Sequence, residues 1–448
     1  MRTLPLTRTL FLLVTVTFSA AAGSPAQTLP LDELIAQAME GPALRAARAR
    51  IERARAGEAL AVAPRRLQAG LEARAWQYAS TVGFVLPATL AGPLGGASMG
   101  VPIADRRAES IALVADQLLW DAGRSAAALR AARRESRAAR LEQAAVRRAV
   151  RWQVLAAATA WQQALATRQA AEATVRSRQA LVEQVEAFVR HQQVPRADRL
   201  QAQAAAAEAR HRLAGARAQV AAARARLAAL VGRPIPEGAR PGWPELPALP
   251  EGDATALAAE ALERRPVARA FQARARAAAD SAQVARRSRR PELHAQFTAS
   301  RNDDALLLHQ ANAQVTVALR WPLLTGGRAA AAARQAEAVR TEMEALAEQA
   351  RRRIVQEVQQ TLAEDAAAAA RLEAARAALR AAEQALEVAR SRYREGLISG
   401  RELLDAEADA TRAREMDAVA GSTRIAARIA ARLALGLPTT DSEGRITP

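Results

Sequence analysis

The stretch Tyr393-Arg-Glu-Gly-Leu-Ile-Ser-Gly-Arg-Glu-Leu-Leu-Asp-Ala-Glu407 joins two long helical patterns and turns the chain back on itself. Its two glycines interrupt the helix, because glycine is favoured where the backbone must turn and is unfavourable inside a helix. Ser399 and Glu402 have the spacing of a capping box, so the returning helix is predicted to begin at about Arg401. The stretch is therefore predicted to be the tip of a helical hairpin.

A second, less regular tip lies 204 residues earlier (393 − 189), at Val189-Arg-His-Gln-Gln-Val-Pro-Arg-Ala-Asp198. The same offset relates Gly123 to Gly327 and Pro234 to Pro438, and it holds between these points without a gap. A constant offset over more than a hundred residues indicates an internal duplication. The chain is thus predicted to contain one structural unit twice.

Each unit contains two predicted strands before its long helix. Apolar and polar residues alternate at 67–74, 293–299 and 313–321, and less regularly at 111–120. A period of two indicates strands with one apolar and one polar face. Between the strands of the first pair, the Gly/Pro-rich segment from about Gly83 to Pro102 is predicted to be a loop.

The long helices carry a coiled-coil pattern. Neither proline nor glycine occurs from Arg124 to Val189 or from Arg328 to Tyr393. Stretches of about 65 residues, each rising ~1.5 Å, make helices about 100 Å long. In the second helix a leucine or tyrosine recurs every seven residues up to Tyr393. Such a repeat predicts a seam of packed helices.

The predicted segments follow from these patterns. They are a signal peptide at 1–26, a first repeat at 27–234, a proline-rich linker at 235–252, a second repeat at 253–438 and a C-terminal tail at 439–448. The first repeat begins with one helical pattern from Leu31 to about Ala63, and has strands at about 66–79 and 108–120 and a hairpin at 124–232 with its tip at 190–198. The second has strands at about 291–300 and 312–322 and a hairpin at 328–436 with its tip at 394–400.

The N-terminus predicts export. Arg2 and Arg8 precede an apolar centre at 10–16, and small residues offer cleavage after Ala22 or Ala26. The apolar run is too short for a membrane-spanning helix, and no later stretch is long enough. Removal of the two signal arginines changes the net charge from +18 to +16 (18 − 2).

Composition argues against an enzyme. The chain has no cysteine, so disulfides and Cys-ligated metals are excluded. Its four scattered histidines form no i, i+4 metal pair, and we find no Gly-rich phosphate loop and no Ser/His/Asp arrangement. We therefore expect no catalytic residue, metal or cofactor.

Amphipathic strands on an exported chain suit a small soluble sheet or part of an outer-membrane barrel. Four strands cannot close a barrel, and open edges in lipid would leave backbone groups without hydrogen bonds. Spanning the membrane therefore requires several chains to share one barrel.

The duplicated order of helix, strand, strand, long helix, tip and helix resembles the TolC family of outer membrane efflux proteins. The resemblance covers about Leu31 to Pro438. Its sharpest parts are the tip Arg394-Glu-Gly-Leu-Ile-Ser with Leu403-Leu-Asp-Ala406, the strand–helix turns at Gly123-Arg and Gly327-Arg, and the helix ends at Gly232 and Gly436.

The resemblance implies a mainly α fold with a small β part. Three identical chains would form an α-helical tunnel through the periplasm and share a twelve-stranded barrel in outer membrane lipid. The implied function is that of an exit duct for a tripartite efflux pump or type I secretion system. The duct would conduct substrates passively from a periplasmic adaptor and an inner-membrane transporter. A drug, a metal ion or a secreted protein would all be compatible substrates.

The resemblance also implies roles for residues at the tips. Adaptor docking falls on Gly396, Leu397, Ile398 and Ser399, and in the first tip on Gln192, Gln193 and Val194. The first tip departs from the family pattern, with glutamine in place of glycine at 192 and proline at 195. A turn in any helical hairpin would also account for these residues.

The family's acidic gate corresponds to Glu402 and Asp405, and its latch between hairpins to Tyr393 and Asp198. Helix capping by Glu402, a solvated helix face for Asp405 and seam packing by Tyr393 are the simpler alternatives. The family's latch arginine is replaced by Ile398, and Arg401 or Arg196 is a candidate substitute.

Two rival functions remain open at this point. A basic helical protein could bind nucleic acid, but the export signal and the acids interleaved with the arginines argue against it. A periplasmic coiled-coil adaptor or scaffold without a barrel would not need two amphipathic strand pairs in equivalent places. We expect an outer membrane duct without a nucleic-acid partner.

Overall fold

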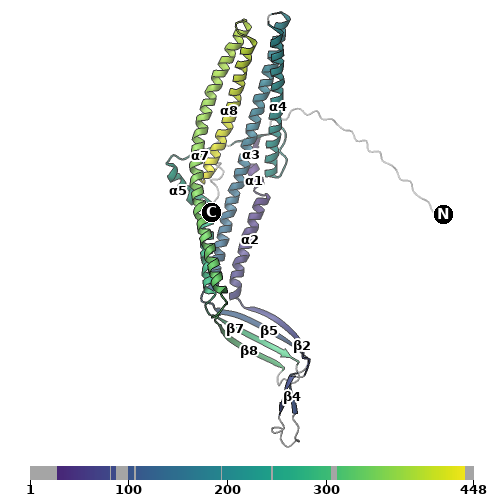
Figure 1. The fold of residues 1–448 in the computed structure, drawn as a ribbon, viewed down its shortest axis with the longest axis vertical. Helices are drawn as coiled ribbons and strands as arrows, with labels where there is room; N and C mark the ends of the chain where they lie inside the picture. Colours follow the sequence, from purple (N-terminus) through teal and green to yellow (C-terminus); the bar gives the residue numbers. More distant parts are fainter. Residues whose placement is uncertain are drawn as a thin grey trace, which may run out of the picture.

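The computed structural model describes residues 28–80, 82–86, 99–104, 107–192, 194–243, 246–303 and 310–438. The predicted signal peptide and C-terminal tail lie outside these residues, as does Gln193. The molecule is long and narrow, with the two hairpin tips at one end and the strands at the other (Figure 1). The predicted fold class, mainly helical with a small β part, is confirmed.

Each repeat opens with a pair of short helices separated just before a proline. The pairs are α1 (Leu31–Ala38) with α2 (Pro42–Val62), and α5 (Ala254–Arg264) with α6 (Pro266–Arg287). Gly41 and Arg265 both adopt extended backbone angles, because a residue before proline is kept out of the helical region. The single helical pattern expected from Leu31 to Ala63 is therefore two helices, followed by a 3₁₀ turn, η1 (Ala63–Arg65).

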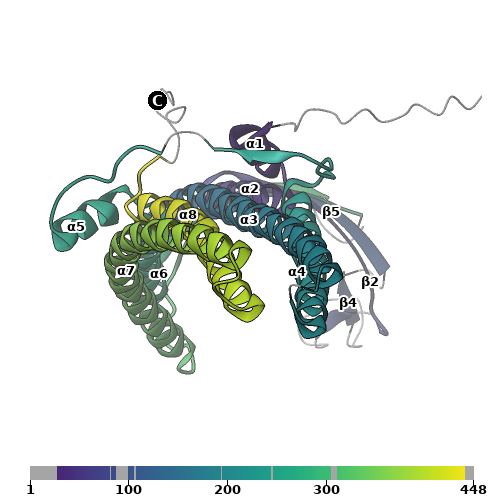
Figure 2. The same cartoon turned by 90° about the horizontal axis from the view of Figure 1, so that it is seen from above.

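Two long hairpins form the body of the molecule. They consist of α3 (Arg124–Arg190) with α4 (Arg196–Val231), and α7 (Arg328–Arg394) with α8 (Gly400–Ala434). α3 and α7 each have 67 residues and are therefore about 100 Å long. Seen from above, α7, α8, α3 and α4 form a curved layer, with α7 at one end and α4 at the other (Figure 2).

Most contacts between the hairpins are made by α3 and α8, with a few more between α4 and α8. Alanine is the most frequent buried residue in both helices. Larger side chains gather in separate clusters: one around Trp161 and Leu227, a second where α5 packs near Ile354 on α7, and a third close to the tips. The core is thus distributed along the helices rather than concentrated at one centre.

The main sheet has four antiparallel strands in the order β2, β5, β7, β8. Their bounds are Gln68–Gln77, Arg107–Trp120, Glu292–Asn302 and Ala311–Arg320. β5 of the first repeat pairs with β7 of the second, so the two repeats share one sheet.

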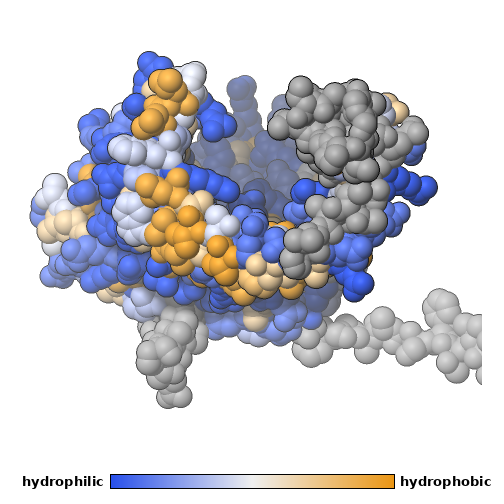
Figure 3. Space-filling view, turned by 90° about the horizontal axis from the view of Figure 1, so that it is seen from below, coloured by the Kyte–Doolittle hydropathy of each residue, from blue (hydrophilic) through white to orange (hydrophobic). Residues whose placement is uncertain are grey.

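Register separates the two faces of this sheet. Leu71, Leu113, Ala299 and Ala313 form one row across the strands, and Gln68, Asp116, Gln296 and Thr316 form another. Rows of the first kind make an apolar face that no element of the described chain covers, and several of its side chains are exposed. Viewed from the strand end, the surface shows hydrophobic patches (Figure 3).

The prediction of a Gly/Pro-rich loop from about Gly83 to Pro102 is wrong over part of this segment. β3 (Val82–Leu86) and β4 (Met99–Ala104) form an antiparallel hairpin there, while residues 87–98 lie outside the described part. Gly83 allows close pairing, since a Cβ at this position would lie 2.4 Å from the carbonyl oxygen of Val101. The glycines and prolines that suggested a loop therefore sit within a bulged pair of strands.

The proline-rich linker also contains regular structure. β6 (Arg240–Gly242) pairs in parallel with β1 (Thr28–Pro30), near the N-terminal end of the described chain. Three-residue edge strands tolerate proline because few backbone N–H groups are needed. Within the described residues, no helix combines the length and apolarity required to cross a membrane.

Candidate functional site at the hairpin tips

The second tip is built by glycine and serine. α7 ends at Arg394, and Gly396 takes a left-handed conformation with φ of +74°. The N–H of Leu397 then donates to the carbonyl of Arg392 at 2.9 Å, closing the helix end as in a Schellman motif. Ser399 caps the returning helix by accepting a hydrogen bond from the N–H of Glu402 at 3.3 Å. α8 begins at Gly400, one residue before the predicted start.

The first tip has a less suitable residue at the left-handed position. Gln192 occupies the position equivalent to Gly396 (192 + 204) and has φ of +60°. A side chain in the left-handed region costs about 1–2 kcal/mol. Pro195 precedes α4, and no side chain caps that helix. The two tips of one chain are therefore unequal in both backbone strain and capping.

The predicted docking residues differ in exposure. Gly396, Leu397 and Ser399 are exposed, and Gln192 is exposed on the first tip. Ile398 and Val194 are half-buried, because they pack on the apolar cluster between the hairpins. The tip surface therefore presents one large exposed hydrophobic side chain, Leu397, among the described docking positions.

The predicted gate residues lie on the first turns of α8. Glu402 and Asp405 are both exposed, three residues apart on one helix. Glu402 also accepts a hydrogen bond from the Ser399 hydroxyl at 3.2 Å. Capping and a free carboxylate at the tip are thus compatible, and the assignment of these two acids to a gate stays a prediction.

The predicted latch residues are close together in one chain. Tyr393 is buried, its ring lies 5.9 Å from that of Phe188, and burial and then the charge of Asp198 raise the pKa of its hydroxyl. The Asp198 carboxylate packs on Gly400, where a Cβ would lie 2.9 Å from Oδ2. The hydroxyl of Tyr393 has no hydrogen-bond partner among the described residues. A latch hydrogen bond therefore stays a prediction.

The candidate substitutes for the latch arginine stay apart from these groups. Arg401 and Arg196 are exposed. Within the described structure, neither one forms an ion pair with Asp198.

A buried ionic cluster near the tips escaped the sequence analysis. Glu407 on α8 lies 3.2 Å from Arg178 of α3 and 3.3 Å from Arg390 of α7. Ser177 donates to the same carboxylate at 3.3 Å and accepts from Arg390 at 2.9 Å. The cluster therefore connects three helices of the two hairpins.

A sequence signal for this cluster was present. Leu403, Glu407 and Ala410 have the i, i+4, i+7 spacing of one helix face, and all three are buried. A carboxylate on an apolar stripe must find cationic partners, since an unpaired buried charge is very costly.

The comparison with protein families matches both repeats. The model of the outer membrane efflux protein family covers residues 34–233 and 257–437. The chain belongs to the outer membrane efflux protein family. Members of this family are outer membrane efflux channels rather than enzymes. The efflux protein is therefore placed in the outer membrane and extends into the periplasm. The alternative of an adaptor or scaffold without a membrane part is not favoured.

Solved outer membrane channels share the fold of this efflux protein. VceC from Vibrio cholerae is 24% identical, with a TM-score of 0.77 over 91% of this chain and 96% of that one. CusC is 23% identical, with a TM-score of 0.79 over 93% and 96%. The open-state MtrE channel of Neisseria gonorrhoeae is 22% identical, with a TM-score of 0.76 over 92% and 89%. No curated protein sequence matches the chain.

Proposed function

We propose that three copies of this efflux protein form one passive exit duct. Their sheets would join edge to edge into a shared twelve-stranded barrel (3 × 4), and their hairpins would enclose a tunnel that ends at the tips. A periplasmic adaptor would bind the tips, and an inner-membrane transporter would supply the energy.

The open sheet carries this proposal. Its outer strands, β2 and β8, have no further partner in the described chain, and its apolar face is exposed. Unpaired strand edges are unfavourable in lipid because their backbone groups lack hydrogen bonds. Joining β8 of one copy to β2 of the next would satisfy both edges, and the apolar face would then contact lipid.

The tips would control opening. Glu402 and Asp405 contribute two acids per chain, so a trimer would place six (3 × 2) near the narrow end of the tunnel. Like charges that converge around an axis attract cations and repel one another. The acidic ring would therefore favour cation entry at the closed tip.

Single-channel recording in a planar bilayer tests the duct and its gate together. The purified mature protein is compared with Glu402→Ala/Asp405→Ala. A matched control is Glu208→Ala, which removes an exposed acid paired with Arg212 on α4. We expect small, cation-preferring steps that lose selectivity or grow only in the tip variant.

The outcomes separate the two parts of the proposal. If the conductance steps are the same in the wild type and the tip variant, the protein is a channel but its gate lies elsewhere. If well-folded trimers repeatedly show no conductance, the proposed duct is contradicted.

A further inference from the structure

One joint between the hairpins is made by an arginine at a helix end. Arg148 on α3 donates to the carbonyl oxygens of Leu433 at 3.1 Å and Gly436 at 3.4 Å, at the C-terminal end of α8. The last carbonyls of a helix lack intrahelical donors and carry the negative end of the helix dipole. A guanidinium is therefore a favourable partner there.

The duplication repeats both halves of this joint. The counterpart of Arg148 is Arg352 on α7 (148 + 204), and the counterpart of Gly436 is Gly232 at the end of α4 (436 − 204). Both glycines have left-handed backbones, with φ of +79° and +81°. The same donor and the same kind of helix end thus occur a second time in the chain.

The second pair is not joined within one chain. The side chain of Arg352 is 80% exposed and forms an ion pair with Glu348, one turn earlier on its own helix. A Cβ added to Gly436 would lie 3.0 Å from Arg264 and 3.7 Å from Arg148, whereas one added to Gly232 would have no atom within 4 Å. The end of α4 is therefore open where the end of α8 is packed.

Arg352 belongs to α7 and the open helix end belongs to α4, and these two helices lie at opposite ends of the curved layer (Figure 2). They cannot meet within one chain. Leu200 on α4 also lacks a neighbouring hairpin to pack against, and it is 61% exposed. Its counterpart Leu404 (200 + 204) packs on the cluster between the hairpins. α4 thus carries a second feature that is satisfied on α8 by contact with the neighbouring hairpin.

We propose that Arg352 of one chain binds the C-terminal end of α4 in a second copy, at the carbonyls of Ala229 and Gly232. The interface between copies then repeats the α3–α8 joint, with α7 in the place of α3 and α4 in the place of α8. A head-to-tail interface of this kind closes into a ring when the rotation per copy fits. The inference rests on the proposed trimer and identifies the residues that hold it.

Cross-linking of the full-length protein tests this contact. The chain has no cysteine, so a short bis-maleimide reacts with engineered positions alone. We expect Arg352→Cys/Ala229→Cys to give covalent dimers and trimers. As an internal standard, Arg148→Cys/Leu433→Cys should cross-link within single chains without adding oligomer bands.

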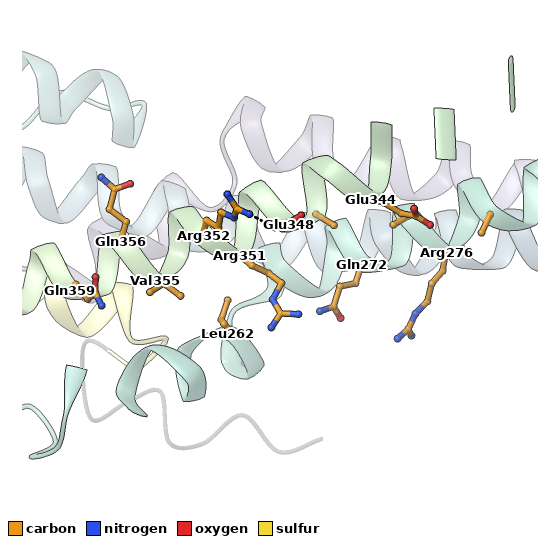
Figure 4. A pocket seen from close by; sticks show the side chains of 13 residues that line it. Leu262, Gln272, Arg276, Glu344, Glu348, Arg351, Arg352, Val355, Gln356 and Gln359 are labelled. Atoms are coloured by element: carbon orange, nitrogen blue, oxygen red, sulfur yellow. Dashed lines mark hydrogen bonds and ion pairs between the residues drawn. The ribbon is translucent and has the colours of Figure 1, made fainter. Parts of the chain in front are cut away.

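Arg351 provides the matched negative control. Both arginines line the groove of ≈ 900 Å³ between α6 and α7, but their side chains leave α7 in different directions, that of Arg352 toward Glu348 and that of Arg351 away from it (Figure 4). Arg351→Cys/Ala229→Cys should give few interchain products. A second measurement compares Arg352→Ala with Arg351→Ala. Both remove one arginine, but only the first should lower the temperature at which the oligomer dissociates.

The results distinguish failure of this contact from failure of the trimer. An intact oligomer that gives no interchain product, while the intrachain standard reacts, overturns the contact. Equal loss of oligomer stability in the two alanine variants also overturns it. A wild-type protein that sediments as a monomer in detergent and in membranes contradicts the proposed trimer itself.

Discussion

Glu407 on α8 and Arg178 on α3 form a buried ion pair, with 3.2 Å between Oε2 and Nη1. It links the two hairpins close to the end where the tunnel is proposed to open. The counterparts one repeat away are Gln203 and Ala382, which carry no charge. The ion pair therefore belongs to the joint within a chain and has no equivalent in the proposed joint between chains.

Loss of this carboxylate should destabilise the chain strongly. Glu407→Gln leaves the buried Arg178 without its counter-charge, and breaking a buried pair in this way costs about 3–5 kcal/mol. The measurement is the urea midpoint of unfolding. Gln203→Ala, at the counterpart position on α4, should change the free energy of unfolding by less than about 0.5 kcal/mol.

The double substitution Arg178→Met/Glu407→Met separates pairing from packing. Replacing both charges by apolar side chains is often neutral or stabilising. Recovery of most of the stability lost in Glu407→Gln is therefore expected. A double variant as unstable as the single one would show that the site depends on shape rather than on charge pairing.

Because of Tyr393, we expect the folded chain to lose stability at alkaline pH. Burial and then Asp198 raise the pKa of its hydroxyl, so the folded chain keeps this proton to higher pH than the unfolded chain. The resulting stabilisation is complete below the ordinary tyrosine pKa of about 10 and is lost as pH rises through the raised value. The free energy of unfolding of the wild type should fall more steeply above that pH than that of Tyr393→Phe. Identical pH profiles would contradict this assignment.

The two tips predict opposite effects of glycine substitution. Gly396→Ala should destabilise by about 1–2 kcal/mol, because it places a side chain in the left-handed region. Gln192→Gly should stabilise by up to about 1 kcal/mol, since relief of the left-handed strain exceeds the added freedom of the unfolded chain. Gly215→Ala is the control: this glycine lies inside α4 with open space around it and should stabilise the helix. Chemical denaturation of the three variants measures all three signs.

The sheet predicts a face-dependent effect on membrane insertion. Val317 lies on the apolar face of β8, where arginine should cost about 2–4 kcal/mol if the face contacts lipid at mid-depth. Thr316, its neighbour on the opposite face, should accept arginine. The measurement is the fraction of each variant recovered in the outer membrane after expression. Equal recovery would indicate that the apolar face does not contact lipid.

Local chemistry explains why so much of this fold was predictable. Glycine and proline positions mark the ends of helices, and a constant offset exposes the duplication. Alternation identifies the four main strands, and these signals act over a few residues. β3, β4 and β6 were not predicted, because their pairing overrides the glycine and proline content of their sequences.

The candidate site divides in the same way. The amino-acid sequence by itself determined the repeat, the two tips, the serine cap and the amphipathic strands, because each depends on neighbouring residues in the chain. Only the tertiary structure decided that Glu407 meets Arg178, 229 positions away (407 − 178), and that Arg148 binds the end of α8. Such contacts depend on which helices become neighbours, and that choice is made by the packing of whole helix faces.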